Sequence, residues 1–174
     1  MCVICYIPKG VKTPSKQVLK AMHDTNPHGM GFCTPTMFHK GLNFDYFLQQ
    51  LSKRDISEPC ILHFRLATNG SIKRANCHPF MQGDVCFAHN GILRVRAKND
   101  MTDSETAFVK YLYPCIQKYG LHSRQLGDVV MNLIGGSKFI FMQGDDVTYY
   151  GEFFKRNGCY YSNLRFAYRL YHQF

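Results

Sequence analysis

The chain has 174 residues, of which 45% are hydrophobic and 19% charged, and this composition excludes an intrinsically disordered protein. Lysine and arginine outnumber aspartate and glutamate by 21 to 12, and the resulting net charge of +9 favours anionic partners without identifying one. No apolar run reaches the roughly 18 residues of a membrane-spanning helix, and no secretory signal is recognisable. We expect a single domain over residues 1–174, located in the cytoplasm and not bound to a membrane.

The eight cysteines are scattered along the sequence, and several lie inside apolar runs. In a reducing compartment such thiols usually pack as small hydrophobic side chains, so a disulfide framework is not expected. Cys2 and Cys5 have the spacing of half a zinc site, with Cys77 and His78 as a conceivable second half. Because these last two residues are adjacent rather than spaced, a zinc site is disfavoured.

The basic residues are spread along the chain, with modest local density in SIKRAN, ILRVRAK and FFKRNG. No recognised nucleic-acid-binding motif accompanies them, so nucleic acid remains a conceivable partner that no motif indicates. A solvated basic surface is the favoured interpretation, and docking to an acidic partner is the alternative.

In the first half of the chain, apolar β-branched runs predict strands and an apolar stripe predicts helices. The expected order is strand, helix, two strands, helix and two strands, over residues 2–7, 15–23, 28–34, 36–41, 44–54, 60–67 and 84–91. Pro8 ends the first strand, and Pro35 marks the turn between the next two. Asn43 has the side chain of a helix N-cap.

The second half begins with helices and ends with strands. Helices are predicted over 102–120, interrupted by Pro114, and over 123–134, and strands over 138–143, 147–153 and 158–164. Thr102 and Glu105 have the spacing of a capping box, and Asn157-Gly158 is a hairpin signal. Strands, then two adjacent helices, then strands again favour antiparallel sheets layered with helices over a doubly wound parallel sheet.

Three polar clusters stand at predicted strand ends or at a helix start: HFRLATNG, AHNG and TDSE. Each has a structural interpretation. Arg65 could be a salt-bridge partner, Asn90-Gly91 could be a hairpin turn leading into a strand, and Asp103 could be a first-turn acid. Taken singly, the structural interpretation is favoured for each cluster.

Taken together with Met-Cys at the N-terminus, the clusters resemble a family. RLATNG running on to NCHPF, then AHNG, TDSE and a late YYSNL follow the order seen in the class II glutamine amidotransferases, the glutaminase domains of the N-terminal-nucleophile hydrolases. This resemblance implies an α+β fold, a four-layer αββα sandwich of two antiparallel sheets flanked by helices. It also implies one glutamine amidotransferase type-2 domain.

The resemblance implies a chemistry that begins with removal of Met1. The Cys2 thiol would then attack the γ-amide of glutamine, and its own α-amino group, with a pKa of about 8, would act as the base. Asn90 and Gly91 would form the oxyanion hole. Hydrolysis of the resulting thioester would release glutamate and ammonia for an unknown acceptor, such as a separate synthase. No metal or organic cofactor is implied.

The resemblance also assigns the substrate-binding residues. Arg65 would hold the α-carboxylate of glutamine, Asp103 its α-ammonium group, and Thr68 would line the pocket. Some members have histidine at the position of Asn69, so no role is carried over to it, and none is assigned to His78. Two alternatives stay open: an amidase acting on another γ-glutamyl or amide substrate, and a catalytically silent basic binding module on the same fold.

Overall fold

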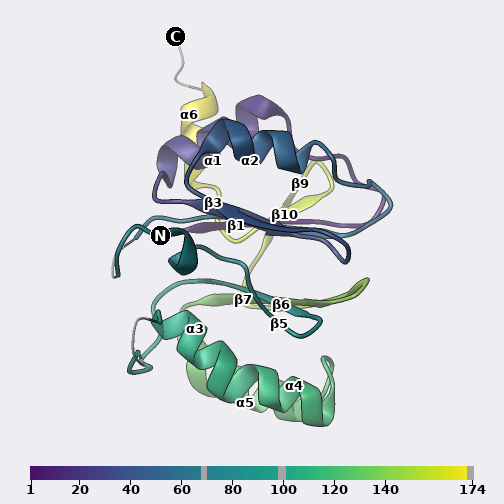
Figure 1. The fold of residues 1–174 in the computed structure, drawn as a ribbon, viewed down its shortest axis with the longest axis vertical. Helices are drawn as coiled ribbons and strands as arrows, with labels where there is room; N and C mark the ends of the chain where they lie inside the picture. The colour runs from purple at the N-terminus through teal and green to yellow at the C-terminus, as the bar shows by residue number, and fades with distance from the viewer. Residues whose placement is uncertain (68–69, 98–100, 172–174) are drawn as a thin grey trace.

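The structure is a computed structural model that describes residues 1–67, 70–97 and 101–171, and these residues form four layers (Figure 1). Two β-sheets stack face to face in the middle, and helices cover the outer face of each sheet. Every strand pair in both sheets is antiparallel. The predicted α+β sandwich is therefore confirmed.

The larger sheet has six strands in the order β3-β2-β4-β1-β10-β9. They are β1 (Val3–Ile7), β2 (Met30–Cys33), β3 (Phe38–Gly41), β4 (Cys60–Phe64), β9 (Phe154–Arg156) and β10 (Cys159–Tyr161). The N-terminal strand β1 is central, because it pairs with β4 on one side and β10 on the other. Val3 lies opposite Phe64, so the residue that precedes β1 meets the segment that follows β4.

The smaller sheet has four strands in the order β5-β6-β7-β8. They are β5 (Phe80–Gln82), β6 (Val85–Asn90), β7 (Lys138–Gln143) and β8 (Asp146–Tyr150). The short strand β5 was not predicted, and it forms a hairpin with β6 across a turn at Gly83. β6 ends at Asn90 and its two neighbours are β5 and β7, so the interpretation of Asn90-Gly91 as a hairpin turn is wrong.

Helices α1 (Lys16–Thr25), α2 (Phe44–Leu51) and α6 (Tyr168–Tyr171) lie over the larger sheet (Figure 1). Helices α3 (Asp103–Ala107), α4 (Tyr113–Tyr119) and α5 (Arg124–Ile134) lie over the smaller one. Four helices begin at a side chain that accepts a backbone N–H, and the sequence predicts two of these caps, Asn43 and Thr102. The four caps are Ser15, Asn43, Thr102 and Ser123. None of the helices in the described ranges is long and apolar enough to cross a lipid bilayer.

The helix predicted over 102–120 is divided into three segments. A π-helical turn over Phe108–Leu112 separates α3 from α4, and Pro114 lies in the first turn of α4. A proline cannot donate the backbone hydrogen bond that a continuous α-helix requires, so the helix changes its pitch just before this residue.

The strand predicted over 147–153 ends early, because β8 stops at Tyr150 and residues 151–153 form the connection to the larger sheet. Gly151 has a φ of 91°, and there the chain leaves β8 and crosses to β9 of the larger sheet. The hairpin predicted at Asn157-Gly158 joins β9 to β10, with Arg156 opposite Cys159. This crossing brings the end of the chain beside its beginning.

Three apolar layers fill the spaces between the four structural layers. One lies between the larger sheet and its helices, a second between the smaller sheet and its helices, and a third between the two sheets. The inter-sheet layer is built from small and aliphatic side chains: Ile4, Cys33, Ile61, Cys86, Ala88, Ile140 and Met142.

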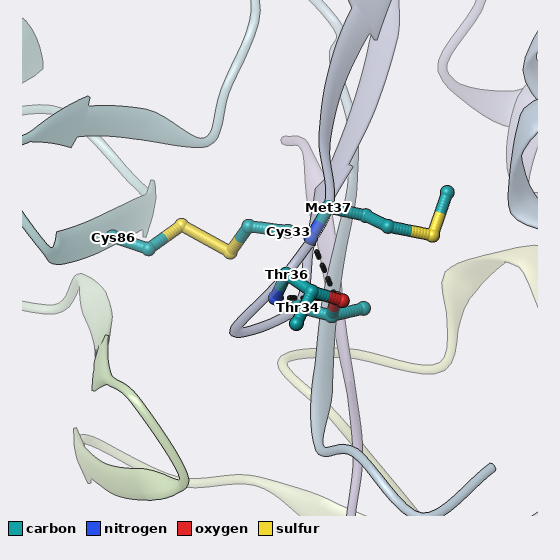
Figure 2. Close-up of a disulfide and its surroundings, with 5 residues drawn as sticks. All are labelled: Cys33, Thr34, Thr36, Met37 and Cys86. Atoms are coloured by element: carbon teal, nitrogen blue, oxygen red, sulfur yellow. Dashed lines mark hydrogen bonds between the residues drawn. A yellow bond between two sulfur atoms is a disulfide. The ribbon is translucent and has the colours of Figure 1, made fainter. Parts of the chain in front are cut away.

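A disulfide between Cys33 on β2 and Cys86 on β6 crosses the inter-sheet layer (Figure 2). The expectation that all eight cysteines are free thiols is therefore wrong for this pair. Two buried cysteines on facing strands meet across the two sheets, a proximity that sequence spacing could not reveal. Directly after Cys33, the side chain of Thr34 accepts hydrogen bonds from the backbone N–H groups of Thr36 and Met37 and closes the turn to β3.

Candidate active site

A cavity of about 320 Å³ opens where the ends of β4 and β6 meet the N-terminus and the start of α3. Cys2, Arg65, Gly91 and Asp103, which are far apart in the sequence, all line it. The antiparallel register of β1 and β4 explains the proximity of Cys2 and Arg65, since Val3 pairs with Phe64. The cavity therefore gathers a thiol, a guanidinium group and a carboxylate from three separate segments.

Cys2 is held at the cavity through its sulfur atom. The backbone N–H of Leu66 donates to Sγ at 3.4 Å, and Sγ lies 3.6 Å from the carbonyl oxygen of the same residue. Burial raises the pKa of the Cys2 thiol, and the backbone hydrogen bond from Leu66 opposes this effect in part. The uncharged thiol is thus favoured, and deprotonation would need a base nearby.

Arg65 is 4% exposed, although its charged group lines the cavity. Its Nη1 atom donates to the carbonyl of Ser71 at 3.0 Å. Its backbone N–H donates to Gly29 and its carbonyl accepts from His28, which extends the pairing of β2 and β4. The guanidinium group is therefore held by the backbone of Ser71 where it lines the cavity, and a planar cation in this position suits the binding of a carboxylate.

Asn90 and Gly91 lie at the end of β6. Gly91 lines the cavity, whereas the Asn90 side chain is 2% exposed and donates from Nδ2 to the Ser162 hydroxyl at 2.8 Å. Gly91 has a φ of 149°, and a Cβ atom there would collide with the side chain of Ser137. Only glycine fits this position without a shift of the neighbouring chain.

Asp103 is the first residue of α3, with Thr102 as the cap before it. One carboxylate oxygen accepts from the backbone N–H of Leu93 at 3.0 Å, and the other accepts from Ser104 N–H at 2.8 Å. These bonds fix the carboxylate at the rim of the cavity. The first-turn interpretation of Asp103 and a ligand-binding role are thus compatible.

Thr68, the remaining predicted site residue, lies outside the described residues, as does Asn69. Gly70 and Ser71, which follow them, line the cavity. The assignment of Thr68 to the substrate pocket remains a prediction.

Three histidines lie buried at the cavity, and two of them, His78 and His89, contribute to its wall. The rings of His63 and His78 are 4.4 Å apart, and His63 donates from Nε2 to the carbonyl of His89 at 3.1 Å. Burial lowers the pKa of His63 to about 3 and that of His89 to about 4, and it holds the pKa of His78 well below its ordinary value. At neutral pH all three are uncharged, so they add no positive charge to that of Arg65.

Two residues that the sequence did not assign to the site hold it together. Ser162 contacts the Asn90 side chain, and the Asn163 side chain donates to the backbone carbonyl of Cys2 at 2.8 Å. Both belong to YYSNL, a motif for which the sequence predicts only a late strand. Their role depends on the pairing of β10 with β1, which no local pattern specifies.

A family model described as "Glutamine amidotransferases class-II" matches residues 48–150, which is more than half of the chain. The chain belongs to this family. Among curated proteins it is similar to the "Probable glutamine amidotransferase DUG3" of Saccharomyces cerevisiae, with 39% identity over 44 residues that cover 25% of this chain and 12% of the yeast protein.

Solved structures show the same fold. The chain is similar to the glutamine phosphoribosylpyrophosphate amidotransferase from B. subtilis complexed with ADP and GMP, with a TM-score of 0.56 and 17% identity. A structure described as the allosteric regulatory enzyme of purine biosynthesis gives a TM-score of 0.57 and 16% identity. Each match covers 92% of this chain and 41% of the other, so the chain spans less than half the length of these proteins.

Proposed function

We propose that the protein hydrolyses the γ-amide of glutamine through a thioester on Cys2, releasing glutamate and ammonia. The observation that carries this proposal is the composition of the cavity wall, which contains the Cys2 thiol, the Arg65 guanidinium group and the Asp103 carboxylate. The two charged groups match the two charged α-substituents of an amino acid, and the thiol supplies a nucleophile for its side chain.

The proposed nucleophile is activated by removal of Met1. Met1 is 45% exposed, which favours the access of an aminopeptidase to this residue. Cleavage converts an amide nitrogen into an α-amine with a pKa of about 8, which can accept the thiol proton at neutral pH, directly or through water. Since burial raises the pKa of this thiol, the reaction depends on such a base.

In the first half-reaction the Cys2 sulfur attacks the γ-carbonyl carbon, a C–S bond forms, and the carbonyl oxygen becomes negative. The backbone N–H of Gly91 and the side-chain amide of Asn90 would donate to this oxygen. One donor of this kind typically contributes about 10²–10³ in rate. The C–N bond then breaks, and the proton held by the α-amine passes to the leaving nitrogen, which departs as ammonia.

In the second half-reaction water attacks the thioester, with the same amine as base. A C–O bond forms, the C–S bond breaks, and glutamate leaves with the thiol restored. Arg65 and Asp103 would bind the α-carboxylate and α-ammonium groups throughout, so they contribute to substrate binding in both steps. Ammonia passes to solvent or to a separate acceptor protein.

Labelling with a glutamine analogue that carries a γ-diazoketone electrophile tests this function. The mature protein, checked by intact mass for loss of Met1, should be modified at Cys2 alone and should lose glutamate release in parallel. Cys115 provides the control, because it is the most exposed of the other free cysteines in the described ranges, at 9%. Cys115→Ala should keep both labelling and activity, and Cys2→Ala should lose both.

Each alternative function predicts another result. An amidase for a different γ-glutamyl or amide compound would keep a reactive Cys2 towards a small alkylating agent but would resist the glutamine analogue. A silent binding module would show no hydrolysis of any amide after Met1 is removed. Labelling spread over several cysteines would contradict the proposed site.

A further inference from the structure

Ser162 joins the N-terminal strand to the end of β6 through one buried hydroxyl group. Its Oγ atom accepts hydrogen bonds from the backbone N–H of Ile4 at 2.9 Å and from Nδ2 of Asn90 at 2.8 Å. Its backbone N–H donates in turn to the carbonyl of Ile4 at 3.0 Å. Ser162 is 1% exposed, so these bonds form away from competing water.

The hydroxyl connects the two sheets at the candidate site. Ile4 belongs to the larger sheet and lies two residues after Cys2, whereas Asn90 is the last residue of β6 in the smaller sheet. Asn163, the residue after Ser162, holds the carbonyl of Cys2. A single turn of the chain therefore contacts both the segment of the proposed nucleophile and the proposed oxyanion donor.

The bond to Ser162 also orients the amide of Asn90. The terminal torsion of an asparagine is broad and needs a partner to fix it. Among the described residues, Oδ1 of Asn90 is buried without a hydrogen-bond partner, so the bond at Nδ2 is the one that sets the orientation. Nδ2 carries two hydrogens, and the bond to Ser162 uses one of them, so the same nitrogen retains a second hydrogen as a donor.

We propose that Ser162 is a positioning residue, which fixes Nδ2 of Asn90 relative to Cys2 so that the oxyanion hole is formed before substrate binds. The catalytic consequence of this inference rests on the proposed function. Preorganised donors act without reorganisation during the reaction, so a loosened amide should slow the chemical step more than it weakens binding.

Kinetics of Ser162→Ala in the mature protein test the inference. We expect kcat for glutamine to fall by roughly 10–100-fold with KM changed less than about threefold, since Ser162 contacts neither Arg65 nor Asp103. Thr34→Ala is the matched control, because Thr34 is a buried hydroxyl that accepts two backbone N–H groups at a turn outside the cavity. It should lose stability and keep kcat.

A double-mutant cycle with Asn90→Ala separates positioning from general damage. If Ser162 acts through Asn90, the double variant should be no slower than Asn90→Ala within about threefold. Alkylation of Cys2 by iodoacetamide creates no oxyanion, so its rate should not change in Ser162→Ala. Additive losses in the cycle would overturn the inference.

Two further measurements cover the cases in which Ser162→Ala fails to fold or the protein does not hydrolyse glutamine. Ser162→Thr and Ser162→Val have nearly the same shape and differ in the hydroxyl group, so the Thr variant should retain the higher kcat. NMR exchange of the Asn90 side-chain amide protons needs no activity: they should be protected in the wild type and exchange faster in Ser162→Val. Equal exchange would overturn the positioning role, whereas an inactive, unlabelled wild type with protected protons would overturn only the proposed function.

Discussion

The sulfur atom of Cys2 accepts a hydrogen bond from the backbone N–H of Leu66, the residue that directly follows Arg65. The proposed nucleophile and the proposed carboxylate anchor are thus joined through one backbone contact. The contact exists because β1 and β4 pair with Val3 opposite Phe64, so both groups extend from the same end of one sheet. A change in that register would move both groups.

Gly91→Ala should reduce glutamate release by about 10²–10³-fold, because the backbone N–H that we assign to the oxyanion hole would move. The positive φ and the contact with Ser137 leave no room for a methyl group. Gly127→Ala is the control, because Gly127 lies inside α5 with open space around its position. That variant should keep activity and gain about 0.5–1 kcal/mol of stability in urea unfolding. Full activity in Gly91→Ala would contradict the oxyanion assignment.

Arg65→Lys and Asp103→Asn should raise KM for glutamine by about 10–100-fold, the value of one or two charge-assisted hydrogen bonds, with smaller changes in kcat. Truncated substrates separate the two roles. Arg65→Lys should lose the preference for glutamine over γ-aminobutyramide, which lacks the α-carboxylate. Asp103→Asn should lose the preference for glutamine over glutaramate, which lacks the α-amine.

A charge control for these variants is Lys9→Gln, which removes an exposed positive charge paired with Asp145 outside the cavity. It should leave KM unchanged. If Arg65→Lys and Asp103→Asn lose discrimination against the same truncated substrate, the assignment of one residue to each α-group is wrong.

The buried histidines should make the protein sensitive to acid. Below about pH 6.5 the unfolded chain takes up protons on these side chains, whereas folded His63 and His89 bind them only near pH 3 and pH 4. The free energy of unfolding should therefore fall as the pH falls through this window, by roughly 1–2 kcal/mol per histidine between pH 7 and pH 5. Urea unfolding at a series of pH values measures this slope.

His89→Gln should reduce the pH dependence of the free energy of unfolding. Unfolding of this variant should take up about one proton fewer, since it lacks one of the titrating groups. Ser104→Ala is the matched control, because it removes the hydrogen bond to His89 Nδ1 and keeps the histidine. It should lower stability at every pH while the slope persists. An equal slope in His89→Gln would show that this ring does not stay neutral in the folded state.

The Cys33–Cys86 disulfide should stabilise the fold by about 2–4 kcal/mol, because it restricts an unfolded chain over a sequence separation of 53 residues. Reductant should lower the urea midpoint of the wild type and have no effect on a Cys33→Ala/Cys86→Ala variant. Thiol titration of the denatured, unreduced protein should detect six of the eight cysteines. Detection of eight would contradict the bond.

Local sequence patterns were sufficient for the elements whose signals are local. The caps at Asn43 and Thr102 and the Asn157-Gly158 hairpin were predicted, because they depend on residues that are close together in the sequence. Local patterns failed where the structure of a segment depends on a partner that is distant in the sequence. In the run over 147–153, Gly151 is the one residue that marks the crossing between the sheets. The spacing of the cysteines in the sequence does not indicate that the strands of Cys33 and Cys86 face each other.

The candidate site also contains residues that the sequence predicts and residues that only the three-dimensional structure reveals. Cys2, Arg65, Gly91 and Asp103 were predicted because the resemblance rests on their motifs, and the register of the strands brings them to one cavity. Ser162 could not be predicted, because a serine after a strand is common and its partners lie 72 and 158 residues away. Supporting contacts of this kind are set by topology rather than by composition.

The central position of β1 has a consequence for biosynthesis. Its two neighbours, β4 and β10, are translated after it, and β10 only near residue 160. At ordinary translation rates of about 5–20 residues per second, the first strand waits roughly 10–30 s before both of its partners exist. The segment that carries Cys2 therefore remains without its full set of strand partners during this interval, until β10 completes the sheet beside it.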